Sequence, residues 1–262
     1  MSERVDFSRN AAIYDRRHGA SVSDVGLGRL WLAAGIRKGM RVLDIGAGTG
    51  RVAIPLATHG GRVVALEPAA GMVERLRQKD VGGRVQPLVG EGSKLPFPVG
   101  AFDVVVISRL LYLTPDWRAI LNEACRVLTT GGVLLHEWGN GEADEPWVRI
   151  REEARRLFEQ AGVAAPFHPG VRSEGEVDEQ LAAHRMVRDA MVDLGPGPEI
   201  TLGEFLRRLT EGELSYIWNV PESVRTESLP RLRTWSEQTF DLDAPVHVPR
   251  QVRWTLFRKS AT

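Results

Sequence analysis

The stretch Val42-Leu43-Asp44-Ile45-Gly46-Ala47-Gly48-Thr49-Gly50 decides the fold that we expect for this chain. An apolar run enters a turn that contains three glycines, and a helical pattern follows the turn. Glycine has no Cβ, so it adopts positive φ angles and lets a ligand approach the backbone closely. The N–H groups at the start of the next helix can donate to a polar or anionic ligand. The stretch therefore predicts the first strand and the ligand-binding turn of an open α/β sheet.

Strand and helix patterns alternate from residue 41 to residue 138. Helical patterns begin near Gly50 and occupy residues 69–79 and 116–128. The apolar runs between them are rich in Val, Leu and Ile, as buried parallel strands are. These runs span residues 41–45, 62–67, 84–89, 102–108 and 132–138. The alternation predicts a doubly wound, mostly parallel sheet with right-handed crossovers.

The C-terminal half of the chain adds two strand candidates, which bring the expected sheet to seven strands. Residues 145–161 have the pattern of an amphipathic helix, and residues 185–194 that of a strand. Residues 246–258 alternate apolar and polar side chains, which predicts an antiparallel strand at the edge of the sheet.

A long segment separates the last two expected strands. Residues 196–243 contain helical patterns, two tryptophans and several prolines, and about 48 residues is too long for a plain connection. We therefore expect a helical cap inserted into the α/β fold. The expected organisation is an N-terminal helical lid (1–35), a core (36–195 and 244–262) and the cap (196–243).

Composition narrows the classes of partner. The 262 residues include 34 basic and 34 acidic ones without a basic stripe, so we expect no nucleic-acid partner. No apolar run approaches the roughly 20 residues that span a bilayer, so we expect no membrane partner. Residues 1–10 are polar and lack a signal-peptide core, which favours a cytoplasmic protein. We expect a monomer or a homodimer. Cys125 is the single cysteine, and the histidines lack metal-ligand spacing, so no metal is expected.

The glycine pattern separates two kinds of nucleotide site. A dinucleotide fingerprint needs G-x-G-x-x-G, whereas Arg51 occupies the position of its third glycine, and the Gly-Lys-Ser/Thr ending of a P-loop is absent. Glu67 ends the second expected strand, 21 residues after Gly46. A carboxylate there can accept hydrogen bonds from both hydroxyls of a ribose. The alternative interpretation makes Glu67 a solvated charge at a strand end.

Residues 41–135 resemble the class I methyltransferases related to the enzymes of ubiquinone and menaquinone biosynthesis. The resemblance covers the glycine turn, the second strand with Pro68 and Met72, and the segment 90–97, which is similar to the family's G-D-A-x-x-L-P-F. It continues through residues 102–106 and 126–132. It implies a Rossmann-like fold, S-adenosylmethionine as cofactor and transfer of a methyl group to a small-molecule acceptor.

The resemblance also implies roles for individual residues. The turn residues, among them Asp44, Gly46, Ala47 and Gly48, would face the methionine and ribose parts of the cofactor. Glu67 would hold the ribose, and Pro68, Met72, Glu91, Gly92 and Ser93 would surround the adenine. Glu91 stands where the family usually has aspartate, so its carboxylate reaches further. Ser108 and Arg109 would border the methionine end and the methyl group.

The N-terminal residues 11–17 resemble a helix that folds over the cofactor in family members. Tyr14 could then hydrogen-bond the cofactor carboxylate, and an adjacent arginine could neutralise it. The alternative is an ordinary amphipathic helix with arginines at the surface, and the sequence favours neither.

The acceptor side is weakly marked. Tyr112, His136, Glu137 and Trp138 follow expected strands and are candidates to line the site. His136 could deprotonate a hydroxyl acceptor, although a histidine at a strand end more often has a structural role. Tyr112, Trp138, Trp218 and Trp235 could form an aromatic wall for a flat acceptor, or could simply pack in the core or the cap. No catalytic residue is assigned, and neither the acceptor nor its accepting atom is indicated.

Three other functions compete with a small-molecule methyltransferase. A nucleic-acid methyltransferase would carry an Asn/Asp-Pro-Pro-aromatic motif after the fourth strand, where this chain has Ser108-Arg109-Leu110-Leu111. A non-catalytic S-adenosylmethionine-binding partner or regulator remains a second alternative, although the glycine turn and Glu67 are intact. A nicotinamide oxidoreductase is disfavoured by Arg51.

Overall fold

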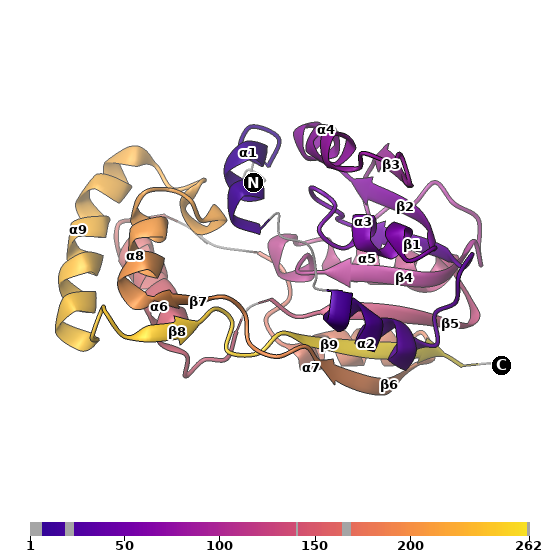
Figure 1. The fold of residues 1–262 in the computed structure, drawn as a ribbon. Helices are drawn as coiled ribbons and strands as arrows, with labels where there is room; N and C mark the ends of the chain where they lie inside the picture. The colour runs from indigo at the N-terminus through magenta and orange to yellow at the C-terminus, as the bar shows by residue number, and fades with distance from the viewer. Residues whose placement is uncertain (1–6, 19–23, 140, 164–168, 261–262) are drawn as a thin grey trace. The chain divides into compact units, whose positions relative to one another are not determined.

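The computed structural model describes residues 7–18, 24–139, 141–163 and 169–260. These residues form two compact units (Figure 1). The unit that we call the sheet unit contains residues 7–18, 24–139, 170–194 and 253–260. The unit that we call the helical unit contains residues 141–163, 169 and 195–252.

A seven-stranded sheet forms the centre of the sheet unit, in the order β3-β2-β1-β4-β5-β9-β6. Its strands are β1 (Arg41–Ile45), β2 (Arg62–Glu67), β3 (Val85–Val89), β4 (Phe102–Ser108), β5 (Leu128–Glu137), β6 (Met186–Asp193) and β9 (Arg253–Lys259). Strands β1 to β5 pair in parallel, and β9 runs antiparallel to both β5 and β6. The predicted seven-stranded, mostly parallel sheet with one antiparallel strand is confirmed.

The antiparallel strand lies inside the sheet and not at its edge, so that part of the prediction is wrong. β9 pairs on both sides, and β6 forms the edge. Four consecutive residues, Trp254 to Phe257, are buried, as both faces of an internal strand are covered. The predicted strand 246–258 also divides in two, since Pro249 has no N–H to continue a ladder. Its first part contributes to β8 (Pro245–His247), which pairs with β7 (Glu199–Thr201) in the helical unit.

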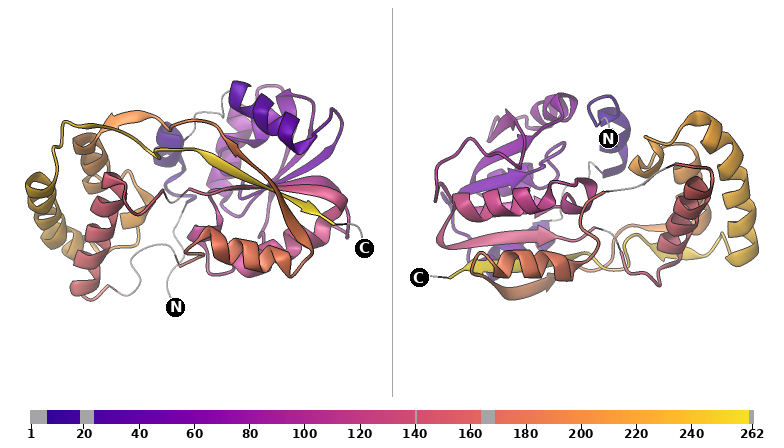
Figure 2. Two further views of the ribbon diagram at one scale, coloured as in Figure 1. Left: turned by 90° about the horizontal axis from the view of Figure 1, so that it is seen from below. Right: turned by 180° about the vertical axis from the view of Figure 1, so that it is seen from behind.

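Helices cover both faces of the sheet (Figure 2). One face packs against α5 (Trp117–Val127) and α7 (Glu174–Ala182), whose apolar side chains share a core with Leu43, Val105 and Leu134. The other face lies against α2 (Asp24–Ala34) and α3 (Ala53–Thr58). The remaining elements of this unit are α1 (Ala11–His18), α4 (Ala70–Lys79) and the 3₁₀ turn η1 (Leu111–Leu113). Apolar residues three and four apart give α5 its buried stripe, as its sequence predicts.

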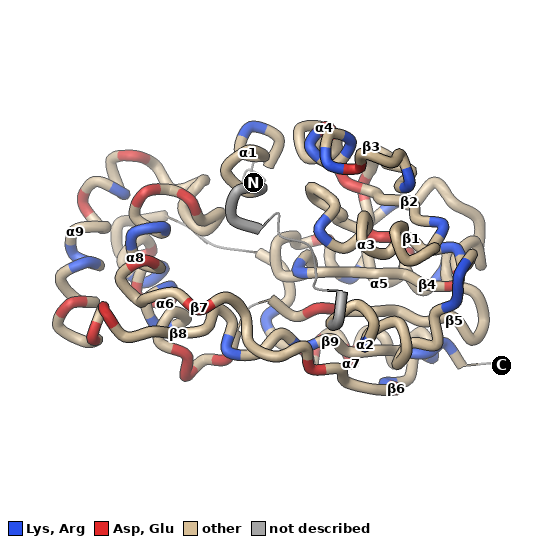
Figure 3. Tube along the Cα trace, in the orientation of Figure 1, with Lys and Arg blue, Asp and Glu red and all other residues tan. Residues whose placement is uncertain are grey.

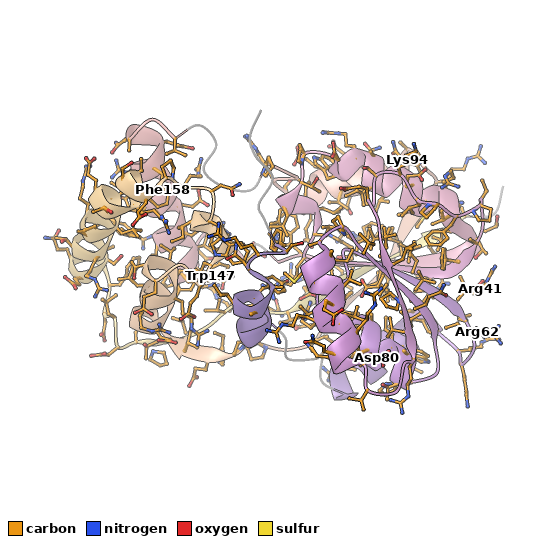
Figure 4. All side chains as sticks on the ribbon, turned by 90° about the horizontal axis from the view of Figure 1, so that it is seen from above. Arg41, Arg62, Asp80, Lys94, Trp147 and Phe158 are labelled. Carbon is orange, nitrogen blue, oxygen red and sulfur yellow. The ribbon has the colours of Figure 1, made fainter. Side chains whose placement is uncertain are left out.

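The helical unit contains α6 (Pro146–Gln160), α8 (Leu202–Thr210), the 3₁₀ turn η2 (Ser215–Ile217) and α9 (Glu222–Thr239) beside the β7–β8 pair. The sequence places residues 145–161 in the core and limits the cap to 196–243. In the structure α6 belongs to the helical unit instead, because its apolar face, which includes Trp147 and Phe158 (labelled in Figure 4), packs with Phe205 and Leu232. Whether this unit acts as a cap remains a prediction. No helix in the described ranges is both long and apolar enough to cross a membrane.

The sheet topology places the candidate site. Arg41 and Arg62 begin β1 and β2 in register, and Figure 4 shows them at the same edge. The carboxyl ends of these parallel strands therefore meet at the opposite edge, where the glycine turn begins. β1 lies between β2 and β4, so the strand order reverses there. Ligands of open α/β sheets bind at such a switch point.

Candidate functional site

The turn after β1 has the conformation that only glycine adopts readily. The φ angles of Gly46, Gly48 and Gly50 are 73°, 55° and 86°. A Cβ on Gly46 would lie 2.7 Å from Cδ2 of Leu110, so a larger residue would also collide with a neighbour. The N–H groups of Gly46 and Ala47 donate to the carbonyl oxygen of Leu66, at 2.8 and 3.1 Å. The turn is thus held against β2.

Glu67 at the end of β2 is fixed by two backbone donors. The Gly48 N–H donates to its Oε2 and the Ala69 N–H to its Oε1, each at 3.0 Å. Only 8% of the residue is exposed. Burial raises the pKa of Glu67, and the two hydrogen bonds oppose that rise. Because a carboxylate oxygen can accept two hydrogen bonds, each oxygen keeps capacity for a further donor such as a ribose hydroxyl.

Asp44 on β1 is a buried carboxylate with spare acceptors. It is 1% exposed, and neither oxygen has a hydrogen-bond partner of normal geometry among the described residues, although the nearby Ala53 N–H helps to lower its pKa. Burial raises its pKa to about 7, although the charge of Arg51 favours the ionised form. A buried polar group without a partner is rare and costly. Asp44 therefore suits a site in which a bound molecule supplies a donor.

Arg51, Ser108 and Glu137 form a cluster at the carboxyl ends of β4 and β5. Arg51 Nη2 donates to Ser108 Oγ at 2.6 Å and pairs with Glu137 Oε2, which also accepts from Ser108 Oγ at 2.6 Å. The side chains of Arg51 and Glu137 are 20% and 4% exposed. In the sequence, Arg51 indicates only that the turn is not a dinucleotide site. In the structure it is the cation of this cluster. A large basic side chain directly after the glycine turn is the signal that could have indicated this role.

Tyr14 on α1 lies next to the glycine turn. Its Cε1 is 3.8 Å from the position that a Cβ on Gly48 would occupy, and its ring meets Phe7 edge-on at 5.9 Å. Burial raises the pKa of the Tyr14 phenol, while the charges of Arg109 and Arg51 act to lower it. Tyr14 therefore offers a neutral hydroxyl close to two cations. The side chains of Arg16 and Arg17, predicted as its neighbours in the site, lie outside the described part of the structure.

The residues predicted to surround an adenine lie at the ends of β2 and β3. Pro68 and Glu91 are exposed, Ser93 is half-buried, and Met72 on α4 is buried. Glu91 is near enough to Glu67 for its charge to raise the pKa of Glu67. A Cβ on Gly92 would lie 2.7 Å from Cγ2 of Ile45, so glycine is needed for this close approach. The structure thus brings these residues to the same edge as the glycine turn.

Arg109 follows β4 in a conformation that is unusual for its type. Its φ angle is 54°, in the left-handed region, and its N–H donates to the carbonyl oxygen of Glu137 at 3.0 Å. Such conformations concentrate at functional sites because the surrounding structure must hold them in place. This turn carries the chain from the cluster to Tyr112.

The acceptor-side candidates fall into two groups. Tyr112 and Trp138 contact each other edge-on at 6.4 Å in the sheet unit, close to the cluster in sequence and fold. Trp218 and Trp235 belong to the helical unit, where Trp218 Nε1 donates to the Gly212 carbonyl at 2.8 Å and Trp235 packs on Phe240. An aromatic wall made from all four residues stays a prediction.

His136 is separated from the cluster by the alternation of the strand. Side chains alternate along β5, so His136 and its neighbour Glu137 point to opposite faces of the sheet. His136 is 2% exposed, and burial lowers its pKa to about 4. These features favour a structural histidine over a general base. In the described ranges, no group of three or more His, Cys, Asp or Glu is placed to hold a metal ion.

Comparison with known proteins agrees with this geometry. Residues 43–136 match the family described as "Methyltransferase domain". A demethylmenaquinone methyltransferase of Clavibacter sepedonicus is 36% identical over 135 residues, which cover 49% of this chain and 54% of the relative. The chain thus spans about half the length of this curated relative.

Solved structures show the fold. A putative methyltransferase of Bacillus halodurans C-125 has a TM-score of 0.64 at 16% identity, over 90% of this chain and all of that one. The [4+2]-cyclase SpnF has a TM-score of 0.62 at 16% identity, over 98% of this chain and 94% of that one. Proteins with this fold catalyse different reactions, so the fold alone does not identify the reaction.

The matched segment begins in β1 and ends in β5, so it contains the glycine turn, Glu67, Glu91 and the β4 turn. The predicted resemblance is confirmed: residues 43–136 match the methyltransferase domain family, and about half of the chain is similar to a demethylmenaquinone methyltransferase.

Proposed function

We propose that this protein is an S-adenosylmethionine-dependent methyltransferase that acts on a small molecule. The observation that carries the proposal is Glu67, held by the Gly48 and Ala69 N–H groups beside the glycine turn. The methyltransferase domain matched by residues 43–136 supports the reaction class. The balanced charge supports a small acceptor over a nucleic acid.

The described residues fit the three parts of such a cofactor. Glu67 keeps acceptor capacity for the ribose hydroxyls, and Glu91 at the same edge of the sheet would hold the adenine. At the methionine end of the cofactor, Arg51 Nη2 and Glu137 Oε2 form an ion pair. Arg51 Nε and Nη1 and Glu137 Oε1 take no part in the hydrogen bonds of this cluster. An ion pair with a free donor and a free acceptor suits the zwitterionic head of an amino acid.

The unpaired oxygens of Asp44 support the same assignment. They are buried at the carboxyl end of β1, where the methionine part of the cofactor is proposed to lie. Donors of a bound cofactor would satisfy them. Tyr14 beside Gly48 adds a neutral hydroxyl that can donate to the cofactor carboxylate.

The main task of the protein is to orient the reactants. Bound S-adenosylmethionine supplies a sulfonium methyl that is already activated. The turn after β1, Glu67 and the Arg51–Glu137 pair would hold it still, which contributes through alignment. Tyr112 and Trp138 lie beside the β4 turn and would exclude water from the acceptor side. The ring of His136 meets that of Trp138 edge-on at 6.3 Å, but burial lowers its pKa to about 4, so the proposal assigns it no role as a base.

Replacing Glu67 by alanine tests the cofactor site. We expect the affinity for S-adenosylmethionine to fall by about 1–3 kcal/mol, because charged hydrogen bonds to the ribose are lost. Isothermal titration calorimetry measures the change. Glu74→Ala is the matched control, since Glu74 lies on the exposed side of α4 and loses the same charge. Equal affinity in Glu67→Ala and the parent would remove Glu67 from the site.

Transfer of a radiolabelled methyl group tests the reaction itself. The acceptor panel contains phenolic and quinol compounds, among them demethylmenaquinone, because the matched relative is named as a methyltransferase of that compound. We expect label in a small-molecule product. Label in tRNA or DNA alone would contradict the acceptor class. Tight cofactor binding without transfer to any acceptor would favour the non-catalytic alternative.

A further inference from the structure

A groove in the helical unit is lined by none of the residues of the candidate site. It has a volume of about 450 Å³. Helix α9 supplies most of its wall, and the last residue of α8 completes it; the two helices are neighbours in Figures 1 and 2. The lining residues are Thr210, Glu222, Arg225, Thr226, Leu229, Pro230 and Arg233.

The arrangement of α9 places two arginines on the groove. Arg225, Leu229 and Arg233 are four residues apart, so their side chains share one face of the helix. Pro230 lies inside the helix and has no N–H to donate to the carbonyl of Thr226. The Thr226 hydroxyl donates to the Glu222 carbonyl. The groove thus combines two cations with the apolar surface of Leu229 and Pro230.

These two arginines differ from several arginines of the neighbouring helices, which pair with glutamates. On α8, Arg207 pairs with Glu204, Glu211 and Glu213, and Arg208 pairs with Glu204. On α6, Arg155 and Arg156 also pair with glutamates. Arg225 and Arg233 make no ion pair with any described residue, although Figure 3 shows both charge signs along α9.

Arg225 is the more informative of the two. It is half-buried, and its Nε is buried without a hydrogen-bond partner in the described structure. Buried polar atoms are normally paired, so an unpaired guanidinium nitrogen at a groove indicates an acceptor supplied from outside. Guanidinium groups hold carboxylates and phosphates through two parallel hydrogen bonds. Glu222 is the one acidic residue of the lining, which leaves the groove with a positive balance.

We propose that this groove binds a small organic anion, a phosphate or carboxylate group carried on an apolar body. Arg225 and Arg233 hold the anionic group, and Leu229 and Pro230 contact the apolar body. The site is independent of the proposed methyl transfer, because it uses none of the residues of the sheet unit.

Titration of the full-length protein with phenyl phosphate, benzoate and phenol tests the proposal. The two anions represent the two possible headgroups, and phenol lacks the charge. We expect saturable binding of at least one anion with one site per chain, and none of phenol. Arg225→Met should weaken that binding about tenfold or more through loss of charged hydrogen bonds. Arg231→Met is the matched control, since Arg231 is exposed on the same helix and does not line the groove.

The proposal would be overturned by no saturable binding of either anion, by equal binding of phenol, or by equal weakening in Arg225→Met and Arg231→Met. Circular dichroism melting of each variant shows whether it is folded. If Arg225→Met is unfolded, Arg233→Met replaces it, with the same expected direction. Binding that Glu67→Ala abolishes and the Arg225 and Arg233 variants retain would place the anion in the cofactor site and also contradict the proposal.

Discussion

Replacing Arg51 by methionine is expected to lower the free energy of unfolding by about 3 kcal/mol, because Glu137 is left buried without its cation. This value lies at the low end of the range for buried pairs, since 20% of the Arg51 side chain is exposed and Ser108 still donates to Glu137. The loss should also weaken the binding of S-adenosylmethionine more than that of 5′-methylthioadenosine, which lacks the amino-acid head. Urea denaturation and calorimetry measure the two effects.

A second variant separates the ion pair from simple loss of packing. Arg51→Met combined with Glu137→Gln should recover most of the lost stability, because no uncompensated charge remains. Arg41→Met is the control in the same unit. Arg41 pairs with Asp103 in an exposed bridge, with 47% and 28% of the side chains accessible, so its loss should cost below about 1 kcal/mol. Equal costs for Arg51→Met and Arg41→Met would contradict the role of the cluster.

The free energy of unfolding of Asp44→Asn is expected to increase relative to that of the parent as the pH rises. Burial raises the pKa of Asp44 from 3.8 to about 7 in the folded state. Between these values the folded chain holds a proton that the unfolded chain has released, so the stability of the parent falls by about 1.4 kcal/mol for each pH unit. Below the lower value both states are protonated, and above the higher value the penalty is constant. Asparagine does not titrate and escapes the penalty.

Urea denaturation at pH 5 and pH 8 checks this sign. The advantage of Asp44→Asn over the parent should grow by about 2–3 kcal/mol between the two pH values, which corresponds to the part of the window from pH 5 to 7. Besides burial, the groups that act on Asp44 are Arg51 and the Ala53 N–H, which lower its pKa, and Glu67 and Glu137, which raise it. A difference that is the same at both pH values would show that Asp44 is ionised throughout.

The parallel part of the fold could be predicted because its strands are buried on both faces. Residues 41–45 and 102–108 are nearly continuous apolar runs, and the structure forms β1 and β4 over these same bounds. The position of β9 could not be predicted in this way. Alternation reports which side chains face the core, but it does not report how many neighbouring strands pair with the backbone.

The extent of the helical unit could not be predicted from the local sequence pattern either. The residues of α6 were recognised as an amphipathic helix, but an apolar stripe does not state which surface covers it. Trp147 and Phe158 pack with Phe205 and Leu232 on two helices much later in the chain, so the partner is set by tertiary structure.

The candidate site divides along similar lines. Gly46, Gly48 and Glu67 could be placed from sequence, since the turn needs glycine and the acid ends a strand. The partners of Glu67 could be identified only in the structure, because they are backbone N–H groups. The pairing of Arg51 with Glu137 joins residues 86 positions apart, which spacing along the chain does not reveal. The opposite orientations of His136 and Glu137 follow from strand alternation, once the strand is known.

The cofactor site is tested most directly by calorimetry of the parent protein with S-adenosylmethionine, S-adenosylhomocysteine and NAD. The site at the carboxyl ends of β1, β2 and β4 predicts saturable binding of both adenosyl compounds, with one molecule per chain, and no binding of NAD. Tight binding of NAD without binding of either adenosyl compound would contradict the account.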